Sequence, residues 1–457
     1  MKSYRRRGVS FGTVFMLLLT IVVAGSCAVI LPKLAGNMDQ RFDAQQLADA
    51  ITGSLDLPAL TLSDIPIFPK AITGTGTDID KMENSPLETS QSAQLPVTNT
   101  LAPLATQPPE KRMIMLSVAG TLAFDGGIRK SGYHGESETY DFSGILSAVS
   151  QVLQGDISLA TLENMLVDNG KLTEVNTTKE VLKEIAASGL DVLSIGHEHI
   201  LDLGLAGLQE TAAAVRAAGF SALGVKTDLQ DTQNVLITDV QGVRIAFLHY
   251  SEIISSAGKK AARTDNCAYA LPSFQIETLT GDVQAARAQG AQIVIVMMHW
   301  GTDEQTKVTK EMREKAQAIA NAGVDMIFGA HGKAALPIEY LTGTWANGVN
   351  RPALVCYSLG GLLTSSRSST DIAGMILKLQ IGFDPAASMI SFDKVEYVPT
   401  YIWRTKENGQ YIYRVIPSDQ PAPEMMDENQ KGVFQKALER INKLLANSPA
   451  KPRISIQ

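Results

Sequence analysis

The stretch that decides the fold reads Leu-Asp-Val-Leu-Ser-Ile-Gly-His-Glu-His-Ile-Leu-Asp-Leu-Gly and spans residues 190–204. Its first half is a short apolar run, which predicts a buried strand. A glycine ends the run, and two histidines, two carboxylates and a second glycine follow at once. In open α/β sheets the chemistry lies just beyond the carboxyl ends of the strands. We therefore expect a functional site at the end of this strand.

The same pattern of strand, glycine and histidine occurs twice more along the chain. An apolar run over 292–298 leads into His299-Trp300-Gly301, and a run over 325–328 leads into Gly329-Ala330-His331-Gly332. Five of the six histidines lie at or just past the end of a predicted strand: His197, His199, His249, His299 and His331. Such a concentration indicates a site assembled from several strand ends.

Length and charge limit the classes of protein that the chain can represent. Its 457 residues, 45% of them hydrophobic, are enough for one large or two medium domains. The net charge is −7, and no basic cluster follows the first few residues. This composition argues against nucleic acid as a partner.

The N-terminus carries the pattern of a membrane anchor. Basic residues in 1–10 precede an uncharged apolar run over 11–32, which is long enough to cross a bilayer as a helix. We expect 1–10 to be a cytoplasmic tail, 11–32 a single-pass transmembrane signal anchor, and the remainder extracytoplasmic. A cleaved signal peptide, with small residues at 23–26, is a less favoured alternative because the apolar run continues to Leu31. A lipoprotein modified at Cys27 is less favoured still, because Ala24 stands where a larger aliphatic residue is expected.

Three further segments follow the anchor. Residues 33–111 are expected to form a flexible linker, because 61–110 is dominated by Thr, Ser, Pro, Gln and Gly. Residues 112–399 are expected to form the main domain. Residues 400–457 are expected to form a C-terminal extension with an amphipathic helix over 427–447.

Alternating strands and helices within the main domain predict an α/β fold with two sheets packed face to face and helices outside. Residues 234–239 and 243–250 predict a hairpin, and 251–266 a loop. Helices are expected over 143–153, 177–188, 205–218, 272–289 and 310–322. Cys267 and Cys356 are either a disulfide pair or two unpaired buried thiols, and the unpaired state is favoured.

Carboxylates and imidazoles at different strand ends are the ligand types that metal-assisted hydrolysis requires. The candidates are Glu163, Glu198, His199, His299 and His331. A single strand-end histidine is more often structural than a ligand, and we expect His249 to be structural and Trp300 to belong to the core. Several such residues together favour a metal site.

The ordered motifs resemble those of the capsule-synthesis protein CapA family over about 112–399. They are Gly120-Thr121, Leu162-Glu163-Asn164, Ser194-Ile195-Gly196-His197-Glu198-His199 with Asp202 and Gly204, His299-Trp300-Gly301, Gly329-Ala330-His331-Gly332 and Tyr357-Ser358-Leu359-Gly360-Gly361. The resemblance implies a four-layer αββα metallophosphatase-like sandwich and a link to poly-γ-glutamate capsules. On this basis we assign Glu163, Glu198, His299 and His331 as metal ligands and His199 and Asp202 as catalytic residues.

The chain departs from the family pattern at four positions. Thr121 stands where the first strand normally ends in aspartate, and Asp125 is the nearest carboxylate. Glu198 replaces a ligand asparagine, Lys333 replaces a ligand histidine, and Gly361 replaces an asparagine. Lysine offers only donors, so it cannot ligate a cation while protonated.

Two accounts of the site remain open at this point. In one, the site holds a single divalent ion of unspecified identity, and Lys333 supplies the charge of a second ion. In the other, the site holds no metal and retains only a binding cleft.

The favoured function for the chain is a membrane-anchored protein that acts on or binds a cell-envelope polymer or its synthesis machinery. The alternatives are a catalytically inactive scaffold module and a metal-dependent phosphoesterase.

Overall fold

The computed structural model describes residues 110–168, 171–231, 235–303, 305–345 and 348–453. The predicted anchor at 11–32 and almost all of the predicted linker lie outside these ranges. Within the described residues, no helix is both long and apolar enough to span a bilayer.

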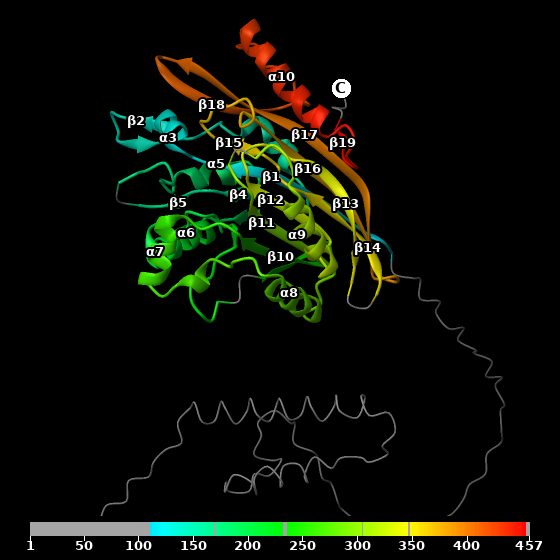
Figure 1. The fold of residues 1–457 in the computed structure, drawn as a ribbon. Coiled ribbons are helices and arrows are strands. Elements are labelled where there is room, and N and C mark those ends of the chain that lie inside the picture. The colour runs from blue at the N-terminus through cyan, green and yellow to red at the C-terminus, as the bar shows by residue number, and fades with distance from the viewer. Residues whose placement is uncertain (1–109, 169–170, 232–234, 304, 346–347, 454–457) are drawn as a thin grey trace, which may run out of the picture. The chain divides into compact units, whose positions relative to one another are not determined.

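The larger of two sheets is mixed (Figure 1). In spatial order its strands are β18 (Gln410–Pro417), β17 (Met389–Glu407), β16 (Ala373–Asp384), β1 (Arg112–Leu122), β4 (Ile157–Leu162), β7 (Val192–Ser194) and β8 (Ser221–Leu223), with β15 (Gly361–Leu363) and β19 (Lys451–Pro452) off this path. The strands β1, β4, β7 and β8 run parallel, while β16, β17 and β18 continue the sheet in antiparallel fashion. The short strands β15 and β19 pair with β1 and β17.

The second sheet has four parallel central strands with an antiparallel strand at each edge. Its order is β13 (Ile338–Thr344), β14 (Asn350–Cys356), β12 (Met326–His331), β11 (Ile293–Trp300), β10 (Val243–Ser251) and β9 (Val235–Val240). Two minor ladders pair β2 (Tyr133–His134) with β3 (Thr139–Tyr140) and β5 (Met165–Leu166) with β6 (Asn176–Thr177).

The main core lies between the two sheets. Alternate residues of β1, such as Leu116 and Val118, point to one face and join a buried cluster with Phe247 of β10 and Phe328 of β12. This shared cluster shows that the sheets pack face to face, which confirms the sequence prediction.

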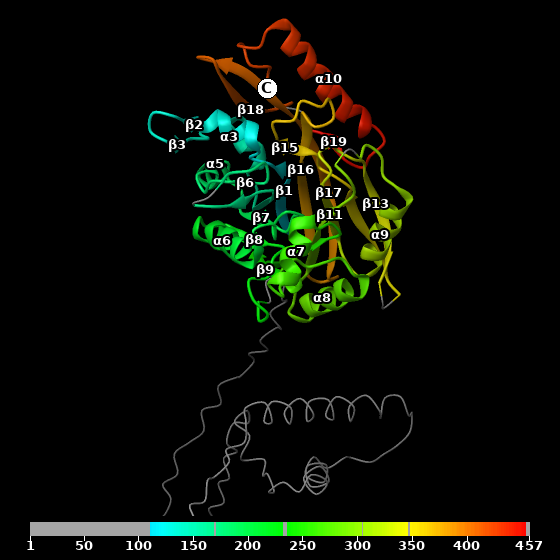
Figure 2. The ribbon, with the colours of Figure 1, turned by 60° about the vertical axis from the view of Figure 1, so that its left-hand side comes forward.

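Helices cover the outer faces of both sheets (Figure 2). On the second sheet, α8 (Ile276–Ala288) and α9 (Lys310–Asn321) bury Leu279 and Ile319. On the larger sheet, the outer cluster draws on α3 (Gly126–Gly132), α4 (Ser150–Leu153), α5 (Val181–Ala187), α6 (Gly204–Ala217) and α7 (Ser256–Thr264). The described residues thus form the four layers, αββα, that the sequence predicts.

The C-terminal part belongs to the same core. The helix α10 (Glu428–Leu444) buries Phe434, Leu438 and Ile441 in the cluster between the sheets, which confirms the predicted amphipathic helix. The predicted boundary at 399/400 falls inside β17, and β18 extends the same sheet. In the structure, therefore, residues 400–453 pack on the same sheet and core as the residues before them.

Several predicted element bounds were wrong. The helix expected over 143–153 is reduced to a 3₁₀ turn at Ser147–Val149 followed by α4. The helix expected from 177 begins at Val181, because Asn176–Thr177 pairs as β6. The expected loop 251–266 contains α7, whose N-terminal amide of Gly258 is capped by the Ser255 hydroxyl. The hairpin of β9 and β10 is confirmed.

Candidate metal centre

Strand ends of both sheets meet at the predicted site. Glu163 follows β4 and Glu198 follows β7 in the larger sheet. In the second sheet, His299 is the next-to-last residue of β11, and His331 is the last residue of β12. The structure therefore brings all four predicted ligand residues into contact range.

Three of these residues form a triangle of potential ligand atoms. One atom each from Glu163, His299 and His331 lie within 4.8 Å of one another. The Nδ1 atom of His299 lies 3.9 Å from a Glu163 carboxylate oxygen, and the two imidazole ring centres are 4.9 Å apart. His331 adopts a left-handed backbone with φ 85°, a strained conformation that is commonest at functional sites.

The buried nitrogen atoms of this triangle are unsatisfied. Nδ1 of His299 and Nδ1 of His331 are both buried and have no hydrogen-bond partner among the described residues. Buried polar atoms without a partner are rare, and a bound ion is one of the established explanations. Two imidazoles and one carboxylate form a donor set that several divalent metals accept. The residues present therefore fit one divalent ion.

Glu198 lies outside the triangle and contacts His299 through the ring nitrogen Nε2. Its carboxylate accepts a hydrogen bond from Nε2 of His299, and it lies 3.4 Å from Nδ1 of His331. Because a carboxylate can only accept, His299 carries its proton on Nε2, and the lone pair of Nδ1 faces Glu163. Carboxylates commonly orient ligand histidines in this way. Direct ligation by Glu198 stays a prediction.

Burial and neighbouring charges shift the pKa values of the triangle in different directions. Burial raises the pKa of Glu163 to about 8, and the neighbouring charge of Glu198 adds to the rise. Burial also lowers the pKa of His299, so its ring stays neutral and able to ligate. For His331, burial lowers the pKa, but the contact with Glu198 and the charge of Glu163 outweigh it and raise the pKa above its ordinary value. For Glu198, burial raises the pKa, but the hydrogen bond from His299 and the nearby His331 outweigh it and hold the pKa well below its ordinary value.

The substituted positions lie around the same triangle. The Thr121 hydroxyl lies 3.4 Å from the Glu163 carboxylate and donates to it. The Lys333 ammonium lies 3.8 Å from Asp303, whose carboxylate is 3.9 Å from Nε2 of His331. Asp303 was not predicted as a site residue from the sequence, although it lies only four residues after His299. Its position shows that Lys333 stands at the edge of the site.

Asp125 does not replace the missing aspartate. Its carboxylate caps α3 by accepting from the amides of Gly127 and Ile128, and it also accepts from Thr364 and Ser365. These bonds occupy the carboxylate away from the triangle. The nearest carboxylate in the sequence therefore has a structural role.

The structure brings His199 and Asp202, the two residues predicted to be catalytic, into contact. Nδ1 of His199 lies 2.7 Å from the Asp202 carboxylate, which also accepts a hydrogen bond from the Ser255 hydroxyl. The hydrogen bond to Asp202 raises the pKa of His199. Nε2 of His199 is 3.5 Å from Glu198, and its side chain is 33% exposed. A partly exposed imidazole beside the triangle has the position of a proton donor. Ser255 was missed because it lies 53 residues away in an expected loop.

The other conspicuous residues are structural. Nε2 of His249 donates to the Gly196 carbonyl at 2.6 Å, and its Nδ1 accepts from the Ser194 hydroxyl at 2.8 Å. A side chain at Gly196 would collide with the backbone of Gly224 and with the His249 ring, so only glycine fits at this position. These contacts agree with the structural role expected for His249.

Trp300 and the cysteines also belong to the interior. The Trp300 indole is 1% exposed and donates to the Tyr357 carbonyl at 3.0 Å, as expected for a core residue. Cys267 and Cys356 are both buried and free, so they do not form a disulfide.

The fold and the triangle define a class: a four-layer αββα protein with carboxylate and imidazole donors gathered at its strand ends. Within this class, residues 115–366 match the family described as bacterial capsule synthesis protein PGA_cap. The chain therefore belongs to this family, which confirms the resemblance found in the sequence.

Individual relatives share only part of their length with the chain. It is 23% identical over 193 residues to the capsule biosynthesis protein CapA of Bacillus anthracis, covering 42% of this chain and 44% of that protein. It is 28% identical over 194 residues to the PGA biosynthesis protein CapA of Bacillus subtilis, covering 42% and 47%. The matches thus span less than half of either relative.

Among solved structures, the chain is similar to the calcineurin-like phosphoesterase YfkN from Bacillus subtilis. The TM-score is 0.37 at 13% sequence identity, and the alignment covers 72% of this chain and 100% of that one.

Proposed function

We propose that this chain is a membrane-anchored protein of cell-envelope polymer synthesis, of the poly-γ-glutamate capsule type, and that its extracytoplasmic domain holds one divalent ion. Membership of the PGA_cap family supports the role in capsule synthesis. The anchor is supported by the basic residues that precede the apolar run over 11–32.

The observation that carries the proposal is the triangle of Glu163, His299 and His331, in which two buried nitrogens have no hydrogen-bond partner among the described residues. Such an ion acts as a Lewis acid on a carbonyl or phosphoryl oxygen when it is bound. Glu198 fixes the tautomer of His299, and burial keeps that ring neutral. His199, oriented by Asp202, holds a proton at the exposed edge of the site.

A second candidate, a scaffold module without catalysis, is favoured by the substituted positions. Thr121 provides a hydroxyl where the family has an anionic ligand, and Lys333 provides an ammonium. Both changes reduce the capacity of the site for cations. A scaffold would keep the cleft and the partner contacts but would not need the ion.

Genetic complementation tests the proposal and separates the two candidates. We expect deletion of the gene in its host to lower the amount of extracellular anionic polymer, and the intact chain to restore it. If the ion is required, the His299→Gln chain will fail to restore polymer although it accumulates normally. Full restoration by His299→Gln would favour the scaffold, and unchanged polymer after deletion would contradict the proposal altogether.

The membrane topology has its own test. A reporter that is active only outside the cytoplasm, fused after Pro69, is expected to be active because positive charge before the apolar run keeps the N-terminus inside. The matched control lacks residues 1–32 and is expected to leave the reporter inactive. Activity of a cytoplasm-only reporter at the same position would contradict the proposed orientation.

A further inference from the structure

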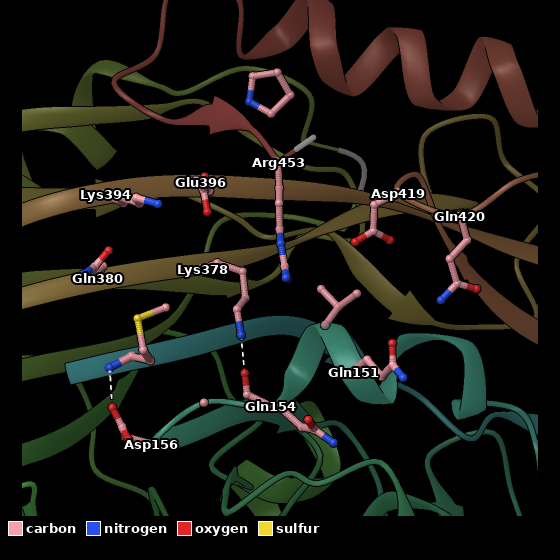
Figure 3. Close-up of a pocket in the computed structure, with 14 residues that line it drawn as sticks. Gln151, Gln154, Asp156, Lys378, Gln380, Lys394, Glu396, Asp419, Gln420 and Arg453 are labelled. Atoms are coloured by element: carbon pink, nitrogen blue, oxygen red, sulfur yellow. Dashed lines mark hydrogen bonds between the residues drawn. The ribbon is translucent and has the colours of Figure 1, made fainter. Parts of the chain in front are cut away.

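A polar pocket lies on the outer face of the larger sheet and shares no lining residue with the metal centre (Figure 3). Its volume is about 940 Å³, and its walls come from the region of α4, from β16 and β17, and from the chain around β19. Ligand pockets typically have volumes of about 300 to 1,000 Å³. The pocket is therefore large enough for a small organic ligand.

The polar lining follows from the alternation of side chains along two strands. Leu377 and Leu379 of β16 point into the core between the sheets, so the intervening Lys378 and its neighbour Gln380 point outward. Across the ladder, Lys378 pairs with Glu396 of β17. This part of the sheet thus exposes charged side chains to the pocket instead of packing beneath a helix.

Two cations converge in the pocket. Lys378 is 6% exposed, and its ammonium donates to the Ser117 hydroxyl at 2.7 Å and to the Gln154 carbonyl. Figure 3 shows the Arg453 side chain reaching down beside Lys378. Burial and the charge of Arg453 lower the pKa of Lys378 to about 8, and the charge of Glu396 opposes this shift only in part. Two like charges held this close in a partly dry site favour an anion between them.

The acidic residues of the pocket offset the charge of this pair only in part. Glu396, opposite Lys378 in the ladder, attracts the Lys378 charge but forms no ion pair with it among the described residues. Within the part of the chain that the structure describes, neither Lys378 nor Arg453 has a carboxylate within ion-pair distance. The Asp156 carboxylate accepts hydrogen bonds from the backbone N–H of Met115 and from the side-chain amide of Gln241. Among the described residues, the buried Oδ1 of Asp419 has no hydrogen-bond partner. In the described part of the chain, the pocket therefore holds two cations without a paired carboxylate and one carboxylate oxygen without a hydrogen-bond partner.

The family match covers only part of the pocket, and eight of its 14 lining residues lie outside the match. The match ends at residue 366, whereas Lys378, Arg453 and Asp419 all come later in the chain. The pocket is also separate from the triangle of Glu163, His299 and His331, with which it shares no lining residue.

We propose that this pocket is a binding site for a small ligand carrying a carboxylate or a phosphate, with the oxyanion held between Lys378 and Arg453. Arginine binds both kinds of oxyanion in bidentate fashion, and a buried lysine adds a point charge. A hydroxyl or ammonium group elsewhere on the ligand would satisfy Asp419.

Calorimetric titration of the purified full-length chain at pH 7 tests this site with two probes, inorganic phosphate and succinate. At least one probe is expected to bind saturably to the unmodified chain. Arg453→Gln is expected to weaken binding about tenfold or more, because a charge-assisted hydrogen bond is lost. Arg453→Lys is expected to recover part of the loss. The stronger probe identifies the oxyanion as phosphate or carboxylate.

The matched control is Lys451→Gln, which removes the same charge two residues away from an exposed position that does not line the pocket. It is expected to keep the affinity of the unmodified chain. Metal content and melting temperature without ligand are expected to stay unchanged in both variants, since the Arg453 side chain makes no hydrogen bond within the described residues. Failure of both probes to bind saturably, or equal weakening by Lys451→Gln and Arg453→Gln, would overturn the proposal.

Discussion

Replacing His299 by glutamine is expected to abolish metal binding, taking the chain from about one ion to close to none. His299 supplies one of three donors in the triangle, and its neutral ring presents Nδ1 toward Glu163. Loss of an outer-shell partner typically lowers metal affinity about 10- to 100-fold, and loss of a direct ligand exceeds this. Elemental analysis of the purified variant measures the effect.

Two variants make this expectation specific. His249→Gln removes an equally buried histidine whose ring nitrogens are both hydrogen-bonded, so it should lower stability but leave the ion in place. Glu198→Gln keeps the size of the side chain that orients His299, so affinity should fall about 10- to 100-fold and the stoichiometry at saturation should stay at one ion. Undiminished metal in His299→Gln would refute the assignment of the triangle.

The second large effect is an increase in the number of metal ions bound per chain. Thr121→Asp combined with Lys333→His is expected to raise the metal content from about one ion per chain to about two. The Thr121 hydroxyl already lies 3.4 Å from Glu163, so a carboxylate in its place would stand beside the existing ligand. Removal of the Lys333 ammonium would also remove a positive charge from the edge of the site. Two cations need this additional negative charge and these donors to offset their mutual repulsion.

Lys333→Met provides the control for this gain. It removes the ammonium without adding a ligand, so the metal content should stay at about one ion. A second ion in Lys333→Met would mean that lysine charge alone had excluded it. Unchanged metal content in the double variant would show that the substituted positions do not limit the site.

The layered fold and the gathering of the site could be predicted because both depend on local patterns. Alternating apolar strands and helices indicate two sheets with outer helices, and histidines after strands indicate a shared edge. His299 and His331, 32 positions apart, indeed meet at a ring separation of 4.9 Å. The periodicity of 427–447 likewise located α10.

Features that depend on contacts between distant segments could not be predicted from the sequence. The helix expected from 177 loses its first turn because Asn176–Thr177 pairs with Met165–Leu166. The hydroxyl that holds Asp202 comes from Ser255, in a segment without strand or site signals. Asp125 lies near Thr121 in sequence but is turned away to cap α3. Only tertiary structure decides such partners.

The pocket of Lys378 and Arg453 illustrates the same limit. A lysine inside an apolar strand pattern shows only that one face is polar, and Arg453 comes from the end of the chain. Their meeting depends on β17 pairing with both β16 and β19.

The most direct test of the central claim is the metal content of the unmodified full-length chain after purification and exhaustive dialysis. The account predicts about one divalent ion per chain, lost in His299→Gln and retained in His249→Gln. Two tightly held ions in the unmodified chain, or no ion under any loading condition, would contradict it.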